Sequence, residues 1–246
     1  MSLNQKINSN LKSLFLENFK EIQYASLLQW LDLLEVENPD IYSINDEKMV
    51  KLYDQSVIEN FKLVKGNKKL LECYEKAIAF DINETEIING FSGDLISSFE
   101  KIKKGIRKIE DSKIQIILLT YSFEPHAWIS GFGEGNYPIL EKPKHFDFNY
   151  KNDFFEMMGH VDYSKIWSNL IELEECLEEA EIFDDIFDTD FFQSLRNSYI
   201  YKTYLLLNKA FEQNKTKLFN GLDFKKPLSI YGHEHDCEKI NVFCYE

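Results

Sequence analysis

Apolar residues recur every three or four positions over much of the chain, which is the spacing of amphipathic helices. The first such run extends from Asn8 to Glu37 and ends at Asn38-Pro39-Asp40, because the residue before proline avoids the helical conformation. The same spacing predicts further helices over Asp46–Phe61, Lys68–Phe80 and Ser92–Glu110. We therefore expect residues 1–112 to be helical.

The pattern changes at Ile114. Ile114–Phe123 is a continuous apolar and β-branched run, which is typical of a buried central strand. His126–Phe132 and Tyr137–Leu140 follow as shorter strands on either side of a glycine-rich turn, and Phe146 and Phe148 alternate with Asp147 in a fourth. This order predicts an antiparallel meander over residues 113–150.

Helical spacing returns at Ser164, and a long aromatic helix is expected from Thr189 or Asp190 through Phe211. The strands Leu228–His235 and Ile240–Tyr245 then form a terminal hairpin. We therefore expect residues 160–215 to be helical and residues 227–246 to form a β hairpin. No linker or repeat marks a boundary, so we expect one α+β domain over residues 1–246, with a mainly antiparallel sheet packed with several helices.

Composition restricts the partners that the chain can have. Its net charge is −14, which disfavours nucleic acid and anionic membrane surfaces and favours a basic protein partner. No apolar run is long enough to span a membrane, and the N-terminus lacks the apolar core of a signal peptide. Four dispersed cysteines are typical of a cytoplasmic protein with reduced thiols, and the excess of lysine over arginine suits a bacterial AT-rich genome.

The most acidic segment extends from Glu172 to Asp190 and contains ten acidic residues with no Lys, Arg or His. Like charges four positions apart destabilise an exposed helix by a few tenths of a kcal/mol each, so this density works against the fold. Ile182, Phe183, Ile186 and Phe187 lie among the acids. The segment is either a solvated helix face with its aromatic side chains turned inward, or a surface for a basic partner that also exposes them. The predicted partner-binding residues are Glu174, Glu175, Glu178, Glu179, Asp184, Asp185 and Asp188.

A second cluster is His233-Glu234-His235-Asp236-Cys237. Side chains two apart on a strand point the same way, so His233 and His235 could bind one transition metal ion such as zinc. The candidates for further ligands are Asp236 or Cys237 in the turn and His126, His145 or His160 elsewhere in the chain. The alternative is a polar hairpin rim whose side chains bond to the turn backbone. No cofactor is expected in that case.

A third cluster, Glu124-Pro125-His126-Ala127-Trp128, lies where a predicted buried strand ends. Glu124 and His126 could form a general base and the group that orients it, with Trp128 lining a pocket. Otherwise the cluster is a tight corner with Trp128 in the core.

Two functional hypotheses remain. The first is a cytosolic protein-binding or inhibitory protein that masks a basic surface, which is the logic of bacterial immunity proteins against toxic nucleases; the comparison rests on charge and size alone. The second is a metal-dependent enzyme built on His233 and His235. A regulatory or scaffold domain with neither property is the third interpretation. No nucleophile or metalloprotease motif is present, so an enzyme is not favoured and no catalytic residue is assigned.

Overall fold

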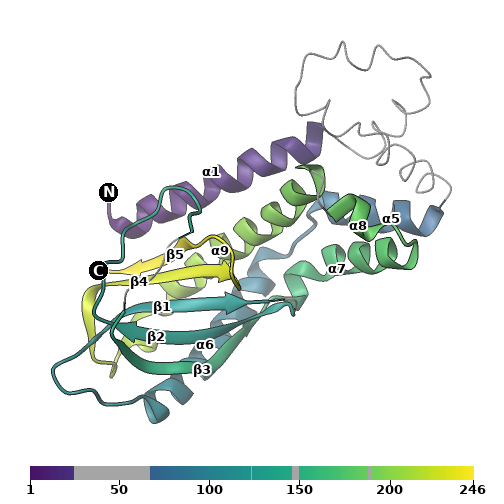
Figure 1. Cartoon of the computed structure of the whole chain (residues 1–246). Helices are drawn as coiled ribbons and strands as arrows, with labels where there is room; N and C mark the ends of the chain where they lie inside the picture. The colour runs from purple at the N-terminus through teal and green to yellow at the C-terminus, as the bar shows by residue number, and fades with distance from the viewer. Residues whose placement is uncertain (25–66, 123, 146–149, 188–189) are drawn as a thin grey trace. The chain divides into compact units, whose positions relative to one another are not determined.

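The computed structural model describes residues 1–24, 67–122, 124–145, 150–187 and 190–246 (Figure 1). The chain divides into two compact units. Unit 1 comprises Met1–Leu14, Asn83–Ile166 and Tyr201–Glu246, and unit 2 comprises Phe15–Ile82 and Trp167–Ile200. The prediction of a single domain stays untested, because two compact units can still fold as one domain.

Unit 1 contains a five-stranded sheet in the order β3-β2-β1-β4-β5. Its central strand, β1, pairs in parallel with β4, and the other three pairings are antiparallel. The chain is therefore an α+β protein, and its sheet is mixed rather than wholly antiparallel. The strands are β1 (Ile114–Tyr121), β2 (His126–Gly133), β3 (Asn152–Asp162), β4 (Phe224–Glu234) and β5 (Ile240–Tyr245).

β1, β2, β4 and β5 lie where the sequence pattern placed strands, but the third strand that the pattern predicted is absent from its expected position. Tyr137–Leu140 was expected to be a strand and is instead an irregular segment. Pro138 has no N–H to give to a sheet, and the backbone N–H of Leu140 bonds to the side chain of Asn241 at 2.7 Å. β3 itself was missed, and the strand expected around Phe146–Phe148 lies outside the described residues.

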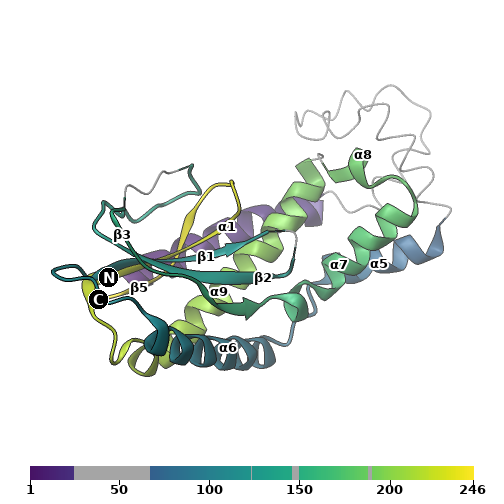
Figure 2. The same cartoon turned by 60° about the horizontal axis from the view of Figure 1, so that its bottom comes forward.

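Two helices, α6 (Glu84–Gly105) and the later part of α9 (Asp190–Phe219), lie on one face of the sheet (Figures 1 and 2). Aromatic rings fill the space between them and the strands. The ring centroids of Phe99 and Phe219 are 5.5 Å apart, and those of Phe211 and Phe243 are 5.4 Å apart. Offset and edge-on aromatic contacts of this kind add to the free energy gained by burying the rings.

The edge strand β3 is bonded to α6 by side chains and backbone. The hydroxyl of Ser98 on α6 both accepts from the backbone N–H of His160 and donates to its carbonyl oxygen, at 3.1 and 2.9 Å. The two backbones approach so closely that a Cβ on Gly159 would lie 2.4 Å from the Cβ of Ser98. The backbone N–H of Arg107 also donates to the carbonyl of Phe154.

Most predicted helices are present, with different ends. α5 (Lys68–Ala79) begins as predicted, at the N-cap Asn67, and α7 (Ser164–Glu179) begins at its predicted first residue. α6 begins at Glu84 rather than at Ser92, and its N-cap Asn83 accepts from the backbone N–H of Glu86. The first predicted helix corresponds to α1 (Leu3–Tyr24), and its predicted continuation beyond Tyr24 lies outside the described residues. The helix expected over Asp46–Phe61 lies outside them as well.

The described part of unit 2 is helical. It comprises α5, most of α7, the short α8 (Phe183–Phe187), which the sequence pattern did not predict, and the ends of α1 and α9 that fall within the unit. The ring of Phe80 packs against that of Tyr199 at a centroid distance of 4.4 Å, and the Tyr199 hydroxyl donates to the carbonyl of Ala77 at 2.8 Å. Among the described helices of both units, none is long and apolar enough to cross a lipid bilayer.

The contact between Gly232 on β4 and the ring of Tyr204 on α9 gives a first prediction. A Cβ on Gly232 would lie 2.4 Å from a carbon of that ring, so Gly232→Ala should lower the free energy of unfolding by about 1–3 kcal/mol. Gly90→Ala on α6 is the matched control, because a Cβ at Gly90 would have no neighbour within 4 Å and alanine favours a helix by about 0.5–1 kcal/mol. Urea unfolding of the two variants should therefore give opposite signs, and equal effects would contradict this account of the sheet–helix contact.

Candidate functional site

All of the excess negative charge of the chain lies in unit 2. Counted along the sequence, unit 2 has 23 acidic residues and 9 Lys and Arg, whereas unit 1 has 19 of each. The net charge of unit 2 therefore equals the −14 of the whole chain. A field concentrated on one part of a protein attracts oppositely charged partners to that part. The acids of unit 2 are therefore the candidate site for such a partner.

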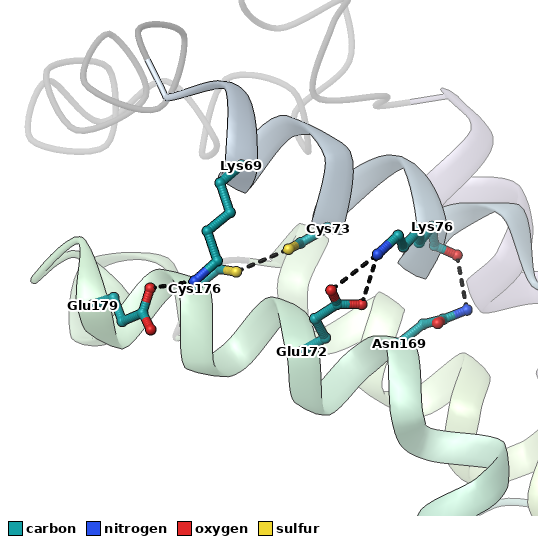
Figure 3. Close-up of polar contacts among 7 residues, drawn as sticks. All are labelled: Lys69, Cys73, Lys76, Asn169, Glu172, Cys176 and Glu179. Carbon is teal, nitrogen blue, oxygen red and sulfur yellow. Dashed lines mark hydrogen bonds and ion pairs between the residues drawn. The ribbon is translucent and has the colours of Figure 1, made fainter.

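Within unit 2, one side of α7 is bonded to α5 (Figure 3). Glu179 pairs with Lys69 at 2.6 Å and Glu172 pairs with Lys76 at 2.9 Å. Between the two ion pairs the sulfur of Cys176 lies 2.8 Å from that of Cys73. Residue numbers rise along α5 as they fall along α7, so the two helices are antiparallel.

Glu174 is neutralised by a different helix. Its carboxylate lies 3.6 Å from the guanidinium of Arg196 on α9, and that guanidinium is also centred 4.9 Å from the ring of Phe187. Glu174 and Glu179 were predicted to bind a partner, but each already faces a cation of its own unit. Their carboxylates are therefore less available to an external partner than the sequence alone indicated.

Four acids of this region remain exposed and form no ion pair with any described residue: Glu175, Glu178, Glu181 and Asp184. We call these four the acidic face. Glu175 and Glu178 are three positions apart and therefore neighbours on the surface of α7. Of the other predicted partner residues, Asp188 lies outside the described residues, and the side chain of Asp185 is not described.

The apolar residues of the acidic segment turn inward. Ile182 and Ile186 are 3% exposed, and Phe183 and Phe187 are half-buried. The centroids of these two rings lie 5.2 Å apart, and each lies 6.0 Å from that of Phe192 on α9. Ile182 and Ile186 thus follow the inward-facing interpretation, whereas Phe183 and Phe187 keep part of their surface in solvent, and the fully exposed side chains of the candidate surface are carboxylates.

His233, the first predicted metal ligand, uses both ring nitrogens within unit 1. Its Nδ1 lies 2.9 Å from the carbonyl of Glu234, so this nitrogen carries the proton. Its Nε2 then accepts from the hydroxyl of Thr120, also at 2.9 Å. Burial, assisted by the charge of Lys239, lowers the pKa of His233 to about 4. The ring is therefore neutral at pH 7 and a weak base there.

The other predicted ligands are bonded elsewhere. His235 lies 3.0 Å from the carboxylate of Asp236, and both side chains are exposed. His126 lies on β2, two strands away from His233 on β4, and its Nε2 is 3.2 Å from the carboxylate of Glu124. Within the described ranges, no three His, Cys, Asp or Glu side chains are grouped as a metal ion requires. The metal hypothesis thus gains no support from these contacts.

Strand register creates a row of side chains that the sequence pattern did not indicate. His160, Trp128, Thr120 and His233 occupy adjacent positions on β3, β2, β1 and β4, on one face of the sheet. The ring of His126 lies 5.1 Å from that of Trp128 and 5.9 Å from that of His160. Trp128 is half-buried and His160 is exposed. The row can offer ring edges to a ligand. Its members are far apart in the sequence and become neighbours only because their strands pair in the sheet.

A cavity of about 480 Å³ lies at the end of unit 1 where α6 leads into β1. Its apolar walls include Ile106, Phe154 and Leu222, and the exposed cations Arg107 and Lys108 lie at its rim. Its volume is within the range of small-molecule sites, roughly 300–1,000 Å³. Acidic side chains line it as well, so its charge does not select one class of ligand.

The buried position of His233 gives a second prediction. Its pKa is about 4 in the folded chain, against an ordinary value of 6.5, so the unfolded chain takes up a proton first as the pH falls. The stability that the neutral ring contributes is therefore fully present above pH 6.5 and is lost as the pH falls toward 4. The loss over that window is about 3 kcal/mol.

Other carboxyl groups titrate over the same range, so the measurement is a comparison of variants. Urea unfolding between pH 7 and pH 4 should show a shallower loss of stability for His233→Gln than for the wild type. His235→Gln changes an exposed ring on the same hairpin and should keep the wild-type slope. Parallel curves for all three proteins would show that His233 is not held neutral by the fold.

Comparison with known proteins adds no assignment. No protein-family model matches the chain, and no curated protein and no solved structure matches it significantly.

Proposed function

We propose that the chain is a protein-binding, inhibitory module that engages a basic protein partner through the acidic face of unit 2. The observation that carries this proposal is the confinement of the whole net charge to unit 2, together with four exposed carboxylates that no described cation of the chain neutralises. Internal ion pairs use the neighbouring acids Glu172, Glu174 and Glu179, and these pairs support the fold instead.

The acidic face fits a partner that binds by charge rather than by apolar contact. The nearby apolar side chains Ile182 and Ile186 are buried, and the rings of Phe183 and Phe187 pack on Phe192. Exposed charge pairs contribute roughly 0.2–1 kcal/mol each, so such a surface governs the association rate and the choice of partner more than the tightness of binding.

A nucleic-acid-binding enzyme is the class of partner that this chemistry favours. A nuclease carries a basic surface because it must bind phosphates, and an acidic protein that covers the surface blocks the enzyme. Bacterial immunity proteins act by that logic in the cytoplasm. The proposal shares the logic and is not based on similarity of sequence or fold.

The test is reversal of charge on the acidic face. The variant Glu175→Lys, Glu178→Lys, Glu181→Lys, Asp184→Lys should lose the partner, with affinity falling at least about tenfold, because four attractive contacts become repulsive. Binding of basic proteins from nuclease-treated host extract to immobilised protein would be compared at about 50 and 500 mM salt, since exposed charge pairing is screened at high salt. The captured partner would then be purified and its affinity measured.

The matched control reverses four acids of unit 1 and so changes the net charge equally. Glu100, Glu110, Glu156 and Glu238 are exposed and form no ion pair with a described residue, so their change to Lys should leave both binding and folding intact. The unit 2 variant should also keep its melting temperature, because none of its four carboxylates forms an ion pair with a described residue. Retention of the partner by that variant, or equal loss in both, would overturn the proposal.

A further inference from the structure

We propose that Cys73 on α5 and Cys176 on α7 are a disulfide-forming pair, which oxidation converts reversibly from two thiols into one covalent link between the two helices. The inference is independent of the proposed function. It rests on the place of the two cysteines in the contact between α5 and α7 (Figure 3).

The two sulfurs meet because matching stripes of the two helices meet. Lys69, Cys73 and Lys76 are spaced by four and three positions on α5, which puts them on one face of that helix. On α7, Glu172, Cys176 and Glu179 have the same spacing. The antiparallel arrangement places each lysine opposite a glutamate and each cysteine opposite the other, so two ion pairs hold the thiols in register from both sides.

The distance between the sulfurs makes bond formation a small movement. Free in this structure, Cys73 and Cys176 have their Sγ atoms 2.8 Å apart and are 2% and 4% exposed. A disulfide needs about 2.0–2.1 Å between the sulfurs, so the two side chains must approach by less than about 1 Å. The remaining cysteines have no such arrangement: Cys237 is exposed, and Cys244 is buried on β5 in unit 1.

The chemistry balances with hydrogen peroxide as the oxidant. One thiol, as its thiolate, attacks a peroxide oxygen; the O–O bond breaks, and the cysteine becomes a sulfenic acid while one water is released. The sulfur of the second cysteine then attacks the sulfenic sulfur, the S–S bond forms, and the sulfenic oxygen leaves as a second water. Two electrons pass from the sulfurs to the peroxide. A dithiol reductant reverses the link by exchange.

Burial makes this pair slow to react. Burial and, after it, the contact with Cys176 together raise the pKa of the Cys73 thiol to about 12. Only a small fraction is thiolate at neutral pH, and the thiolate is the nucleophile. The pair therefore survives brief oxidation and responds to sustained exposure, with a rate that rises as the pH is raised.

The experiment uses the full chain with Cys237→Ser, which removes the exposed thiol. The protein would be incubated with hydrogen peroxide at pH 7 and pH 9, unfolded with a maleimide present, and digested with trypsin without reductant. Peptide 70–76 should be found linked to peptide 166–196, and the intact oxidised protein should take up one maleimide, on Cys244, instead of three. Dithiothreitol should restore three, and the link should form faster at pH 9.

The link should also stabilise the fold, because it closes a loop with a sequence separation of 103 residues in the unfolded chain. We expect the melting temperature to rise by about 5 °C or more on oxidation. Cys73→Ser in the same background is the matched control, and it should show neither the linked peptides nor the rise.

Two results would overturn the inference. One is the absence of linked peptides 70–76 and 166–196 at both pH values, under conditions in which peroxide oxidises Cys237 of the wild type. The other is a link between either of these peptides and peptide 240–246, or a link that lowers the melting temperature, because both would show that the native packing does not accept a bond between Cys73 and Cys176.

Discussion

The parallel pairing of β1 with β4 is the interaction on which unit 1 depends. It joins Ile114–Tyr121 to a strand more than a hundred residues later, and β5 reaches the sheet only through β4. β1 is almost entirely buried, so its peptide groups must find partners on both sides. β2, which is close in the sequence, supplies hydrogen-bond partners on one side of β1. The partners on the other side come from β4, which follows α7, α8 and α9 in the chain. Contacts of such separation are slow to form, so we expect the completion of this sheet to be a late step in folding.

In unit 2 the controlling constraint is repulsion between carboxylates. Ten acids in 19 consecutive residues cannot all face water on adjacent helix positions without cost. The fold distributes them: Glu172 and Glu179 face lysines of α5, Glu174 faces Arg196, and the acidic face is left to solvent. The ion pairs Lys69–Glu179 and Lys76–Glu172 also align Cys73 with Cys176. The contacts that reduce repulsion within the acidic segment therefore also bring these two sulfurs together.

Elements with a strong period of their own could be predicted from the sequence. β1, α5 and α7 belong to this class, because each carries its apolar stripe or run and a clear start. β3 could not, since its Phe154-Phe155 and Met157-Met158 doublets break the alternation, and Met157 has a left-handed backbone. The sequence pattern placed the start of α6 too late because Gly90 and Gly93 lower helix propensity. In the structure both glycines lie within the helix, where an added Cβ would have no neighbour within 4 Å. The acidic segment was visible as composition. Which of its carboxylates pair with a described cation, and which do not, depends on the positions of Lys69, Lys76 and Arg196. The row from His160 to His233 and the cysteine pair depend on register between distant segments, which no local pattern contains.

The bonding of β3 to α6 has a consequence for how copies of the chain behave toward one another. An unprotected edge strand offers a line of free amides and carbonyls on which a second chain can add and start an aggregate. Here Ser98 bonds both backbone groups of His160, the amide of Arg107 bonds the carbonyl of Phe154, and Asp94 accepts from the amide of Asp162. The close approach at Gly159 leaves no room for another strand to slip between sheet and helix. Strand addition, the first step toward a fibre, is thus disfavoured along the β3 edge of the sheet.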